Sequence, residues 1–300
     1  MYPMSFHEFL LASGEEKLCT VLRQANPENP LDTPFHIKLN EYYRIYQLIG
    51  GMPAVVQTYV KEKNLSECQK LLDDILTTLR DDFAKYKKRV SVTRLGEVFD
   101  SIVFQAGNKF KYSNVDSHSS SHSIKEALHL LILAGLAHKI HHTSARGLPL
   151  GAQVNPKKFK VSLYDVGMHQ RLLGLDLKQQ LLSEDLKIVN RGNLAEVFVG
   201  LEFINNAPPT TRHPLYYWHR EKRGSSAEVD FVIQQGDQIV PVEVKAGTKG
   251  QMRSMYIFMK ERNLKKGVRV SMENFSKYGK IVSFPLYAVK NIVTDMISLN

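Results

Sequence analysis

The chain has 300 residues, of which 43% are apolar and 23% are charged. This composition is that of an ordinary globular protein and excludes a disordered, collagen-like or fibrous coiled-coil chain. The 40 lysine and arginine residues outnumber the 30 aspartate and glutamate residues, which gives a formal net charge of +10.

Neither a membrane span nor a secretion signal is visible in the sequence. The longest nearly apolar run, residues 127–137, is much shorter than the roughly 20 residues that cross a bilayer. The N-terminal sequence lacks a basic n-region and a small-residue cleavage site. Cys19 and Cys68 are too few for a disulfide scaffold or a structural zinc site. We therefore expect a soluble, cytoplasmic protein with no membrane partner.

Residues 1–90 predict a helical region. Ser5 followed by Glu8 fits a capping box at the start of a helix. Gly50-Gly51 ends a later helical segment, and Pro53 fits the first turn of the next helix. A longer helix then carries one apolar stripe with acidic residues on its opposite face. These helices read as packing elements without visible chemistry.

Residues 91–168 predict the order of a winged helix-turn-helix domain, which is helix, turn, helix and a two-stranded wing. The second helix is apolar nearly all round, so we expect it to be largely buried. A winged helix that serves only for protein packing is the alternative. The segments are helices at 93–107 and 124–135 and β-rich stretches at 136–142 and 158–166.

Residues 85–160 carry 13 basic and only 4 acidic side chains, so most of the net charge lies there. Such a block is typical of contact with nucleic acid, and DNA is the partner that we expect. The first turn of the second helix has no Arg, Asn or Gln for bidentate base reading, so we expect phosphate contacts with little sequence specificity. A solvated surface is the alternative. The candidate nucleic-acid-binding residues are Lys85, Lys87, Lys88, Arg89, Lys109, Lys111 and Lys125.

Residues 187–300 predict an α+β domain, in which helices cover a mixed sheet. Gly236-Asp237 marks a tight hairpin between two of the strands. The last two strands are joined by a polar loop. The expected elements are a helix at 192–205, strands at 215–220, 228–235 and 238–247, a helix at 249–262, and strands at 267–272 and 282–289.

A group of charged residues in this domain carries the candidate chemistry. Glu243 and Lys245 are two apart on one strand and point to the same face, and the hairpin brings Asp230 beside them. Apolar neighbours make an unpartnered charge costly there, so a divalent cation, Mg²⁺ or Mn²⁺, bound by Asp230 and Glu243 is the natural partner. Lys245 would orient or deprotonate a water or stabilise phosphate charge, and Glu196 would add a carboxylate. A purely structural ion-pair cluster is the alternative.

The pattern Asp230, then Glu243-Val-Lys245, after a helix bearing Glu196 and in the order α-β-β-β-α-β, resembles the PD-(D/E)xK nuclease superfamily. This resemblance implies a restriction-endonuclease-like core and a metal-dependent phosphodiesterase. Members of the superfamily that have lost activity exist, but all four positions are present in this chain.

A closer resemblance covers nearly the whole chain. It rests on the phrases YPMSFHEFLLASG, GGMPAVVQTYV, KFKYSNV, YDVGM, GNLAEVFVGLEF, AEVDFVI and PVEVKAG. They are similar to the region after the ATPase module in a bacterial and archaeal family of AAA-type ATP-binding proteins. The resemblance implies a winged helix followed by a nuclease-like core. No G-x-x-x-x-G-K-[ST] loop occurs in this sequence, so we expect no ATPase activity from it.

The sequence thus predicts an α+β protein with a helical region (1–90), a winged helix-turn-helix (91–168) and a nuclease-like domain (187–300). The function expected is nucleic-acid binding with a metal-dependent nuclease-like site. An ATPase in the same or another chain, or a second copy of this chain, is the protein partner that the resemblance suggests. The alternative function is a non-catalytic docking module built on the nuclease-like fold.

Overall fold

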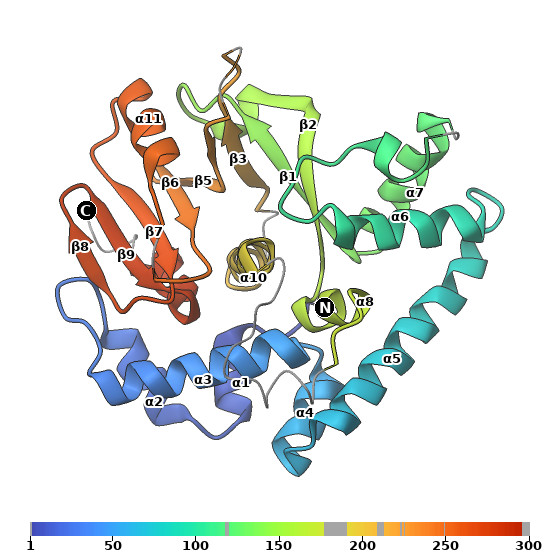
Figure 1. The fold of residues 1–300 in the computed structure, drawn as a ribbon, viewed down its shortest axis with the longest axis horizontal. Coiled ribbons are helices and arrows are strands. Elements are labelled where there is room, and N and C mark those ends of the chain that lie inside the picture. Colours follow the sequence, from blue (N-terminus) through green and yellow to red (C-terminus); the bar gives the residue numbers. More distant parts are fainter. Residues whose placement is uncertain are drawn as a thin grey trace. The chain divides into compact units, whose positions relative to one another are not determined.

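The computed structural model describes residues 2–117, 120–176, 191–208, 213–222, 224, 226–248 and 250–295. Residues 187–190, with which the predicted nuclease-like domain begins, lie outside these ranges. The described chain combines helices with two mixed sheets (Figure 1), so the predicted α+β class is confirmed. No described helix has both the length and the apolar character needed to span a bilayer.

The chain divides into two compact units, neither of which is continuous in sequence. Unit 1 comprises Met1–Met4, Ile45–Lys139 and Lys160–Val189. Unit 2 comprises Ser5–Arg44, Ile140–Phe159 and Asn190–Asn300. The division falls inside one helix, α3 (Thr33–Ile49), and inside two strands, β1 (Ala137–Thr143) and β2 (Val154–Leu163).

Unit 1 is mainly helical, as expected for its part of the sequence. Pro53 occupies the first turn of its helix, and the N-cap Ser91 accepts a hydrogen bond from Arg94 N at 3.2 Å. Both features follow the usual chemistry of helix starts. Its helices are α4 (Pro53–Glu62), α5 (Leu65–Asp82), η1 (Phe83–Tyr86), α6 (Val92–Phe104), η2 (Tyr112–Asn114), α7 (Ser121–Leu133) and α8 (Val166–Leu172).

Helix α7 is less buried than its sequence predicts. One stripe, which includes Ala127 and Leu131, is buried, and α7 packs against α6. Leu133 at its C-terminal end is 62% exposed. The expectation that this helix is largely buried is therefore wrong, because its buried residues form one stripe and the other faces are exposed or half-buried.

Two segments 114 residues apart meet inside unit 1. The carboxylate of Asp165, the N-cap of α8, accepts hydrogen bonds from Met168 N at 2.9 Å and from Gly51 N at 2.7 Å. Burial raises the pKa of Asp165 to about 6, although these hydrogen bonds oppose the shift. Gly50 has a φ of 71°, in the left-handed region that favours glycine. The Asp165 carboxylate thus joins the segments GGMP and YDVGM by binding a backbone N–H group of each.

Gly167→Ala should strongly destabilise unit 1. A Cβ at this position would lie 2.6 Å from Gly50 N and closer still to the Ile49 carbonyl, and backbone atoms cannot rotate away. Overpacking of this kind costs about 1–3 kcal/mol, and we expect about the upper value. Differential scanning calorimetry should show a melting transition lowered by about 6–12 °C. Gly174→Ala is the control for adding a methyl group in open space, although its positive φ has a smaller cost of its own. A Gly167→Ala melting transition that is unchanged would contradict the tight packing.

Unit 2 begins with the predicted capping box. Ser5 Oγ accepts from Glu8 N at 3.3 Å, and Ser5 N donates to Glu8 Oε2 at 2.7 Å. The buried Glu202 then accepts the Phe6 N–H at 2.8 Å, which ties the first helix to α10. Its helices are α1 (Phe6–Ala12), α2 (Glu16–Gln24), η3 (Leu150–Gln153), α10 (Arg191–Asn205), α11 (Arg253–Glu261), η4 (Leu286–Ala288) and α12 (Val289–Asp295).

The strands form a four-stranded sheet in the order β2-β1-β3-β4 and a five-stranded sheet in the order β5-β6-β7-β9-β8. In the first sheet β1 lies parallel to β3, so the strands predicted as a wing belong to a larger sheet. In the second, β6, β7 and β9 are parallel, and β5 and β8 are antiparallel to their neighbours. The remaining bounds are β3 (Leu215–His219), β4 (Glu228–Val229), β5 (Phe231–Gln235), β6 (Gln238–Val244), β7 (Gly267–Ser271), β8 (Ser276–Tyr278) and β9 (Ile281–Pro285).

Three local expectations can be compared with these strands. The hairpin at Gly236-Asp237 is confirmed, because Gln235 pairs with Gln238 across it. The single strand expected over 228–235 is wrong, since it is broken at Asp230 into β4 and β5. The polar loop before the last strand contains the short strand β8, which the sequence did not predict.

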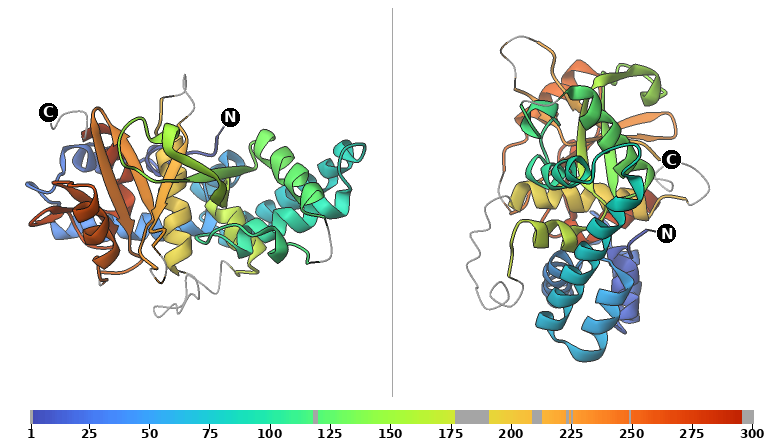
Figure 2. Two further views of the ribbon diagram at one scale, coloured as in Figure 1. Left: turned by 90° about the horizontal axis from the view of Figure 1, so that it is seen from above. Right: turned by 90° about the vertical axis from the view of Figure 1, so that its right-hand side faces the viewer.

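The two faces of the five-stranded sheet are covered by different helices. Phe231, opposite Val242 on β6, packs its ring against Phe203 of α10 at a centroid distance of 5.5 Å. Gly267 and Ile281 lie on the other face, which Met255 and Met259 of α11 cover. The sheet, with α10 beside it, can be followed in Figures 1 and 2. Because side chains alternate along a strand, Glu243 lies on the α11 face.

Candidate active site

The strand break at Asp230 shapes the site. Phe231 pairs with Val242 in the β5–β6 hairpin, so one further step of the register would place Asp230 opposite Glu243. The ladder ends there, and Asp230 Oδ2 instead accepts the Val244 N–H at 2.7 Å. This hydrogen bond holds the Asp230 carboxylate at the carboxyl end of β6. The predicted proximity of Asp230 to the Glu243–Lys245 strand is therefore present in the structure.

Glu243 is a buried carboxylate with one free oxygen. It is 6% exposed, and its Oε1 accepts a hydrogen bond from Lys245 Nζ at 2.7 Å. Its Oε2 is buried and has no hydrogen-bond partner. Burial raises the pKa of Glu243 to about 7, the charge of Asp230 adds to this, and Lys245 opposes it. A buried anion in this state is costly and favours a proton or a cation at its free oxygen.

Lys245 is held in place by its neighbours. Its N–H donates to Val270 O of β7 at 2.8 Å, which fixes the backbone just beyond the end of β6. A Cβ at Gly250 would lie 2.7 Å from Lys245 Cδ, so the lysine stem runs directly over this glycine. The ammonium group is thereby directed to Glu243 rather than into solvent.

Two further charged residues lie at this place, and our sequence analysis missed both. Glu228 adds to the raised pKa of Glu243 by its charge, and it pairs across strands with His219. Arg269 stands opposite Glu243 on β7. Its Nη1 donates to Glu273 Oε2 at 2.7 Å and its Nη2 to Thr248 O at 2.6 Å. The available signals were a carboxylate two positions before Asp230 and a lone arginine inside the apolar strand GVRVS.

Glu196 is placed less directly than the other candidates. It is buried on α10, one turn before Gly200. Gly200 packs against the ring of Phe231, the residue that follows Asp230. Glu243, however, points to the opposite face of the sheet from Phe231. Within the described ranges no three His, Cys, Asp or Glu side chains form a group arranged to hold a metal ion. The structure thus brings together Asp230, Glu243 and Lys245. The contribution of a Glu196 carboxylate to the site stays a prediction.

The predicted nucleic-acid-binding residues are all exposed and all lie in unit 1. Four of them, Lys85, Lys87, Lys88 and Arg89, follow one another at the junction of α5 and α6. Lys109 and Lys111 lie between α6 and α7, and Lys125 of α7 stands over the Tyr112 ring at 5.7 Å. We call these seven residues the basic surface.

Three of the four acidic side chains of residues 85–160 are already paired with an arginine. Asp100 binds Arg80, and Arg94 binds both Glu97 at 2.7 Å and Asp116 at 3.1 Å. Lys85 is paired with Asp82 at 2.6 Å. The structure gives no carboxylate partner, among the residues it describes, for the other six members of the basic surface. Lys160, which contributes to the charge of the segment, is buried and does not belong to this surface.

Glu243→Gln should raise stability in a pH-dependent manner. Because the folded-state pKa of about 7 lies above the ordinary value of 4.5, the folded protein holds this proton more tightly than the unfolded chain. The glutamate therefore lowers the free energy of unfolding by an amount that grows as the pH rises from 4.5 to about 7 and is complete above pH 7. Without metal, the variant should melt several degrees higher than the wild type at about pH 8, with little difference near pH 5. Equal loss of stability at both pH values would instead show that the Glu243–Lys245 pair supports the fold.

Two families of domains match this chain. Residues 40–179 match the model described as Domain of unknown function (DUF8612), and residues 191–288 match the one described as Domain of unknown function (DUF4143). No curated protein and no solved structure matches the chain. The first match contains all seven residues of the basic surface, and the second contains Glu196, Asp230, Glu243 and Lys245. The basic surface thus lies in the segment similar to the first domain of unknown function, and the carboxylate cluster lies in the segment similar to the second.

Proposed function

We propose that this protein binds nucleic acid and hydrolyses phosphodiester bonds with Mg²⁺ or Mn²⁺ at Asp230, Glu243 and Lys245. The observation that carries the proposal is the buried Glu243 Oε2, which has no hydrogen-bond partner and stands beside the Asp230 carboxylate. Carboxylate oxygens are the donors that these hard cations prefer, so the residues present fit such an ion.

Each residue has a definable task in this reaction. Asp230 and Glu243 would hold the ion, which supplies an activated water and polarises the phosphate. Val244 N–H, by binding Asp230 Oδ2, orients that carboxylate toward the site. Lys245 orients or deprotonates the attacking water, or neutralises charge on a phosphate oxygen. The new P–O bond forms as the bond to the leaving nucleotide oxygen breaks, and that oxygen takes up a proton.

The basic surface supports nucleic acid as the substrate class. Six exposed cations without a described carboxylate partner can each contact a phosphate, and six of the seven residues are lysines, which lack the planar two-pronged donor group by which arginine reads base edges. Binding governed by phosphates is weakly sequence-specific and strongly salt-dependent. DNA is the substrate that we would test first.

The finer fold assignments belong to the same proposal. We interpret α6, α7, β1 and β2 as a winged helix, and α10 with β4–β7 and α11 as a nuclease-like core. Domains of the second matched kind are commonly found beside AAA ATPases, which supports an ATPase partner. Such an ATPase would act in the same polypeptide or in trans, and self-association is an equally simple arrangement.

A second candidate, a docking module without catalysis, is favoured by two observations. Asp230 already caps the Val244 N–H and Glu243 already binds Lys245, which are satisfied structural contacts. In unit 1, Phe104 and Leu133 are 68% and 62% exposed, which suits a surface for association.

The deciding experiment is a cleavage assay on purified protein. Plasmid and single-stranded DNA are incubated with Mn²⁺ or Mg²⁺, and EDTA serves as the control. Metal-dependent cleavage that is lost on substitution of Asp230 supports the enzyme. Absence of cleavage over a range of metals and DNA or RNA substrates, together with capture of an AAA-type ATPase, supports the docking module.

A further inference from the structure

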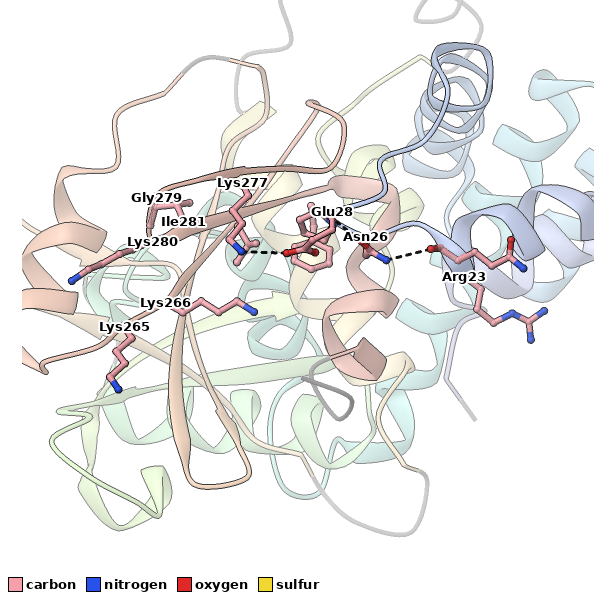
Figure 3. Close-up of a pocket in the computed structure, with 13 residues that line it drawn as sticks. Arg23, Asn26, Glu28, Lys265, Lys266, Lys277, Gly279, Lys280 and Ile281 are labelled. Carbon is pink, nitrogen blue, oxygen red and sulfur yellow. Dashed lines mark hydrogen bonds and ion pairs between the residues drawn. The ribbon is translucent and has the colours of Figure 1, made fainter. Parts of the chain in front are cut away.

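Unit 2 contains a second charged feature, a hollow of about 790 Å³ at the edge of the five-stranded sheet opposite to Lys245 (Figure 3). Its wall on one side is the end of α2 and the turn Asn26–Asn29. On the other side lie the residues just before β7 and the β8–β9 hairpin. The residues just before β7 and at the start of β9 line the hollow, and β7 runs parallel to β6, whose carboxyl end carries Glu243 of the candidate active site.

The lining of the hollow is strongly basic. Five cationic side chains line it, and Glu28 is the only acidic one. Glu28 is paired with Lys277 at 3.3 Å, which leaves the others without a carboxylate partner among the described residues. Like charges gathered around one space repel each other, and a bound anion would relieve this repulsion. The five cations are Arg23, Lys265, Lys266, Lys277 and Lys280.

Lys266 is the central one of these cations. In Figure 3 the Lys266 side chain extends into the hollow toward the side where Glu28 lies, whereas Lys265 and Lys280 point away from the hollow. It is half-buried, and burial lowers its pKa. The charge of Glu28 opposes this shift, but Glu28 forms its ion pair with Lys277, so the ammonium group of Lys266 stays available to bind a phosphate.

The rest of the lining is apolar or rigid. Pro27, Ile281 and Phe284 contribute apolar atoms. The turn on the α2 side is fixed by Asn26 Oδ1, which accepts the N–H groups of Glu28 and Asn29 at 2.9 Å each. The hollow therefore has both cationic side chains and an apolar surface in its lining. Its volume lies within the roughly 300–1,000 Å³ usual for sites of small molecules.

We propose that this hollow binds a small molecule that carries several phosphates on an apolar ring system, the chemistry of a nucleoside polyphosphate. Lys266 and Lys277 contact the phosphates, with Lys265, Lys280 and Arg23 free to turn inward. The apolar lining receives the ring, and Glu28 accepts hydrogen bonds from hydroxyl or amino groups. The site is separate from the carboxylate cluster and does not depend on the proposed nuclease activity.

Isothermal titration calorimetry with ATP tests the proposal, with EDTA present so that no divalent ion takes part. The full chain should bind one ATP, inorganic triphosphate more weakly, and adenosine not measurably at about 1 mM. Lys266→Glu should weaken ATP binding about tenfold or more. Lys266→Gln, a milder change, should weaken it less while keeping the wild-type melting temperature. Lys260→Glu, an equal charge change at an exposed position of α11 outside the lining, should have no effect.

Other outcomes would overturn the proposal. ATP binding that is absent, or unchanged in both Lys266 variants, removes the site. If inorganic triphosphate binds as tightly as ATP, the apolar lining does not contact the ring system of the ligand. A single-stranded oligonucleotide that displaces ATP and itself binds more tightly would assign the hollow to nucleic acid instead. Asp230→Asn should leave ATP binding intact, so failure of the nuclease proposal and failure of this one are distinguishable.

Discussion

Asp230→Asn, Glu243→Gln and Lys245→Met should each abolish Mn²⁺-dependent cleavage, with a loss of at least about 10³-fold. The two carboxylate changes remove a charged oxygen donor, so the ion is held too weakly to activate water. Lys245→Met keeps the stem that packs over Gly250 but removes the ammonium group that reaches Glu243. Nicking of supercoiled plasmid, followed over time on gels, measures the rate.

The pattern of stability separates lost chemistry from lost structure. All three variants should retain cooperative melting, and Glu243→Gln should melt higher at about pH 8. Asp237→Asn at the tip of the same hairpin is the matched control. The Asp237 side chain is exposed, and the substitution removes the same charge as Asp230→Asn. Cleavage that survives in all three site variants would identify a contaminating nuclease and remove the proposed mechanism. Glu196→Gln, tested in parallel, decides whether that buried carboxylate takes part.

Replacing Lys85, Lys87, Lys88 and Arg89 by alanine should greatly weaken DNA binding. Each phosphate contact contributes about 0.9 to the slope of log affinity against log salt, so the loss of four contacts should lower the slope by about 3–4. Measured by fluorescence anisotropy with a labelled duplex, the difference should be largest at low salt. Duplexes of different base sequence should bind with similar affinity, because phosphates carry no sequence information.

Lys61 and Lys70 provide the control for this measurement. Both are cations of unit 1 that lie outside the basic surface, on α4 and α5. Their replacement by alanine should leave the salt slope nearly unchanged. If the fourfold variant keeps the wild-type slope, the cluster at the junction of α5 and α6 is a solvated surface, and the docking module becomes the better candidate.

Several local features could be read directly from the sequence. The capping box of Ser5 and Glu8, the proline at the start of α4 and the two-residue turn at Gly236-Asp237 all lie where they were expected. Each depends on residues only a few positions apart, and their backbone preferences act before any distant contact forms. The proximity of Asp230, Glu243 and Lys245 was predictable for the same reason, since one hairpin and one strand contain them all.

Other features depend on single side-chain contacts or on residues that are far apart in the chain. The break at Asp230 arises because its side chain takes the Val244 N–H in place of a backbone partner, which no periodicity reveals. Gly167 is needed because Ile49 and Gly50 lie against it, and Arg269 stands beside Glu243 only through the parallel pairing of β6 and β7. The side of α7 that remains exposed was likewise set by the neighbours it has.

The sequence by itself determined the α+β class, most helices and strands, and the residue types that could hold a metal or bind phosphates. The tertiary structure alone decided that β1 joins β3, that both compact units are discontinuous, and that a basic hollow forms between α2 and the start of β7 and β9. The physical reason is that hydrophobic periodicity specifies which face of an element is buried, whereas the partner of that face is chosen by packing among all the elements.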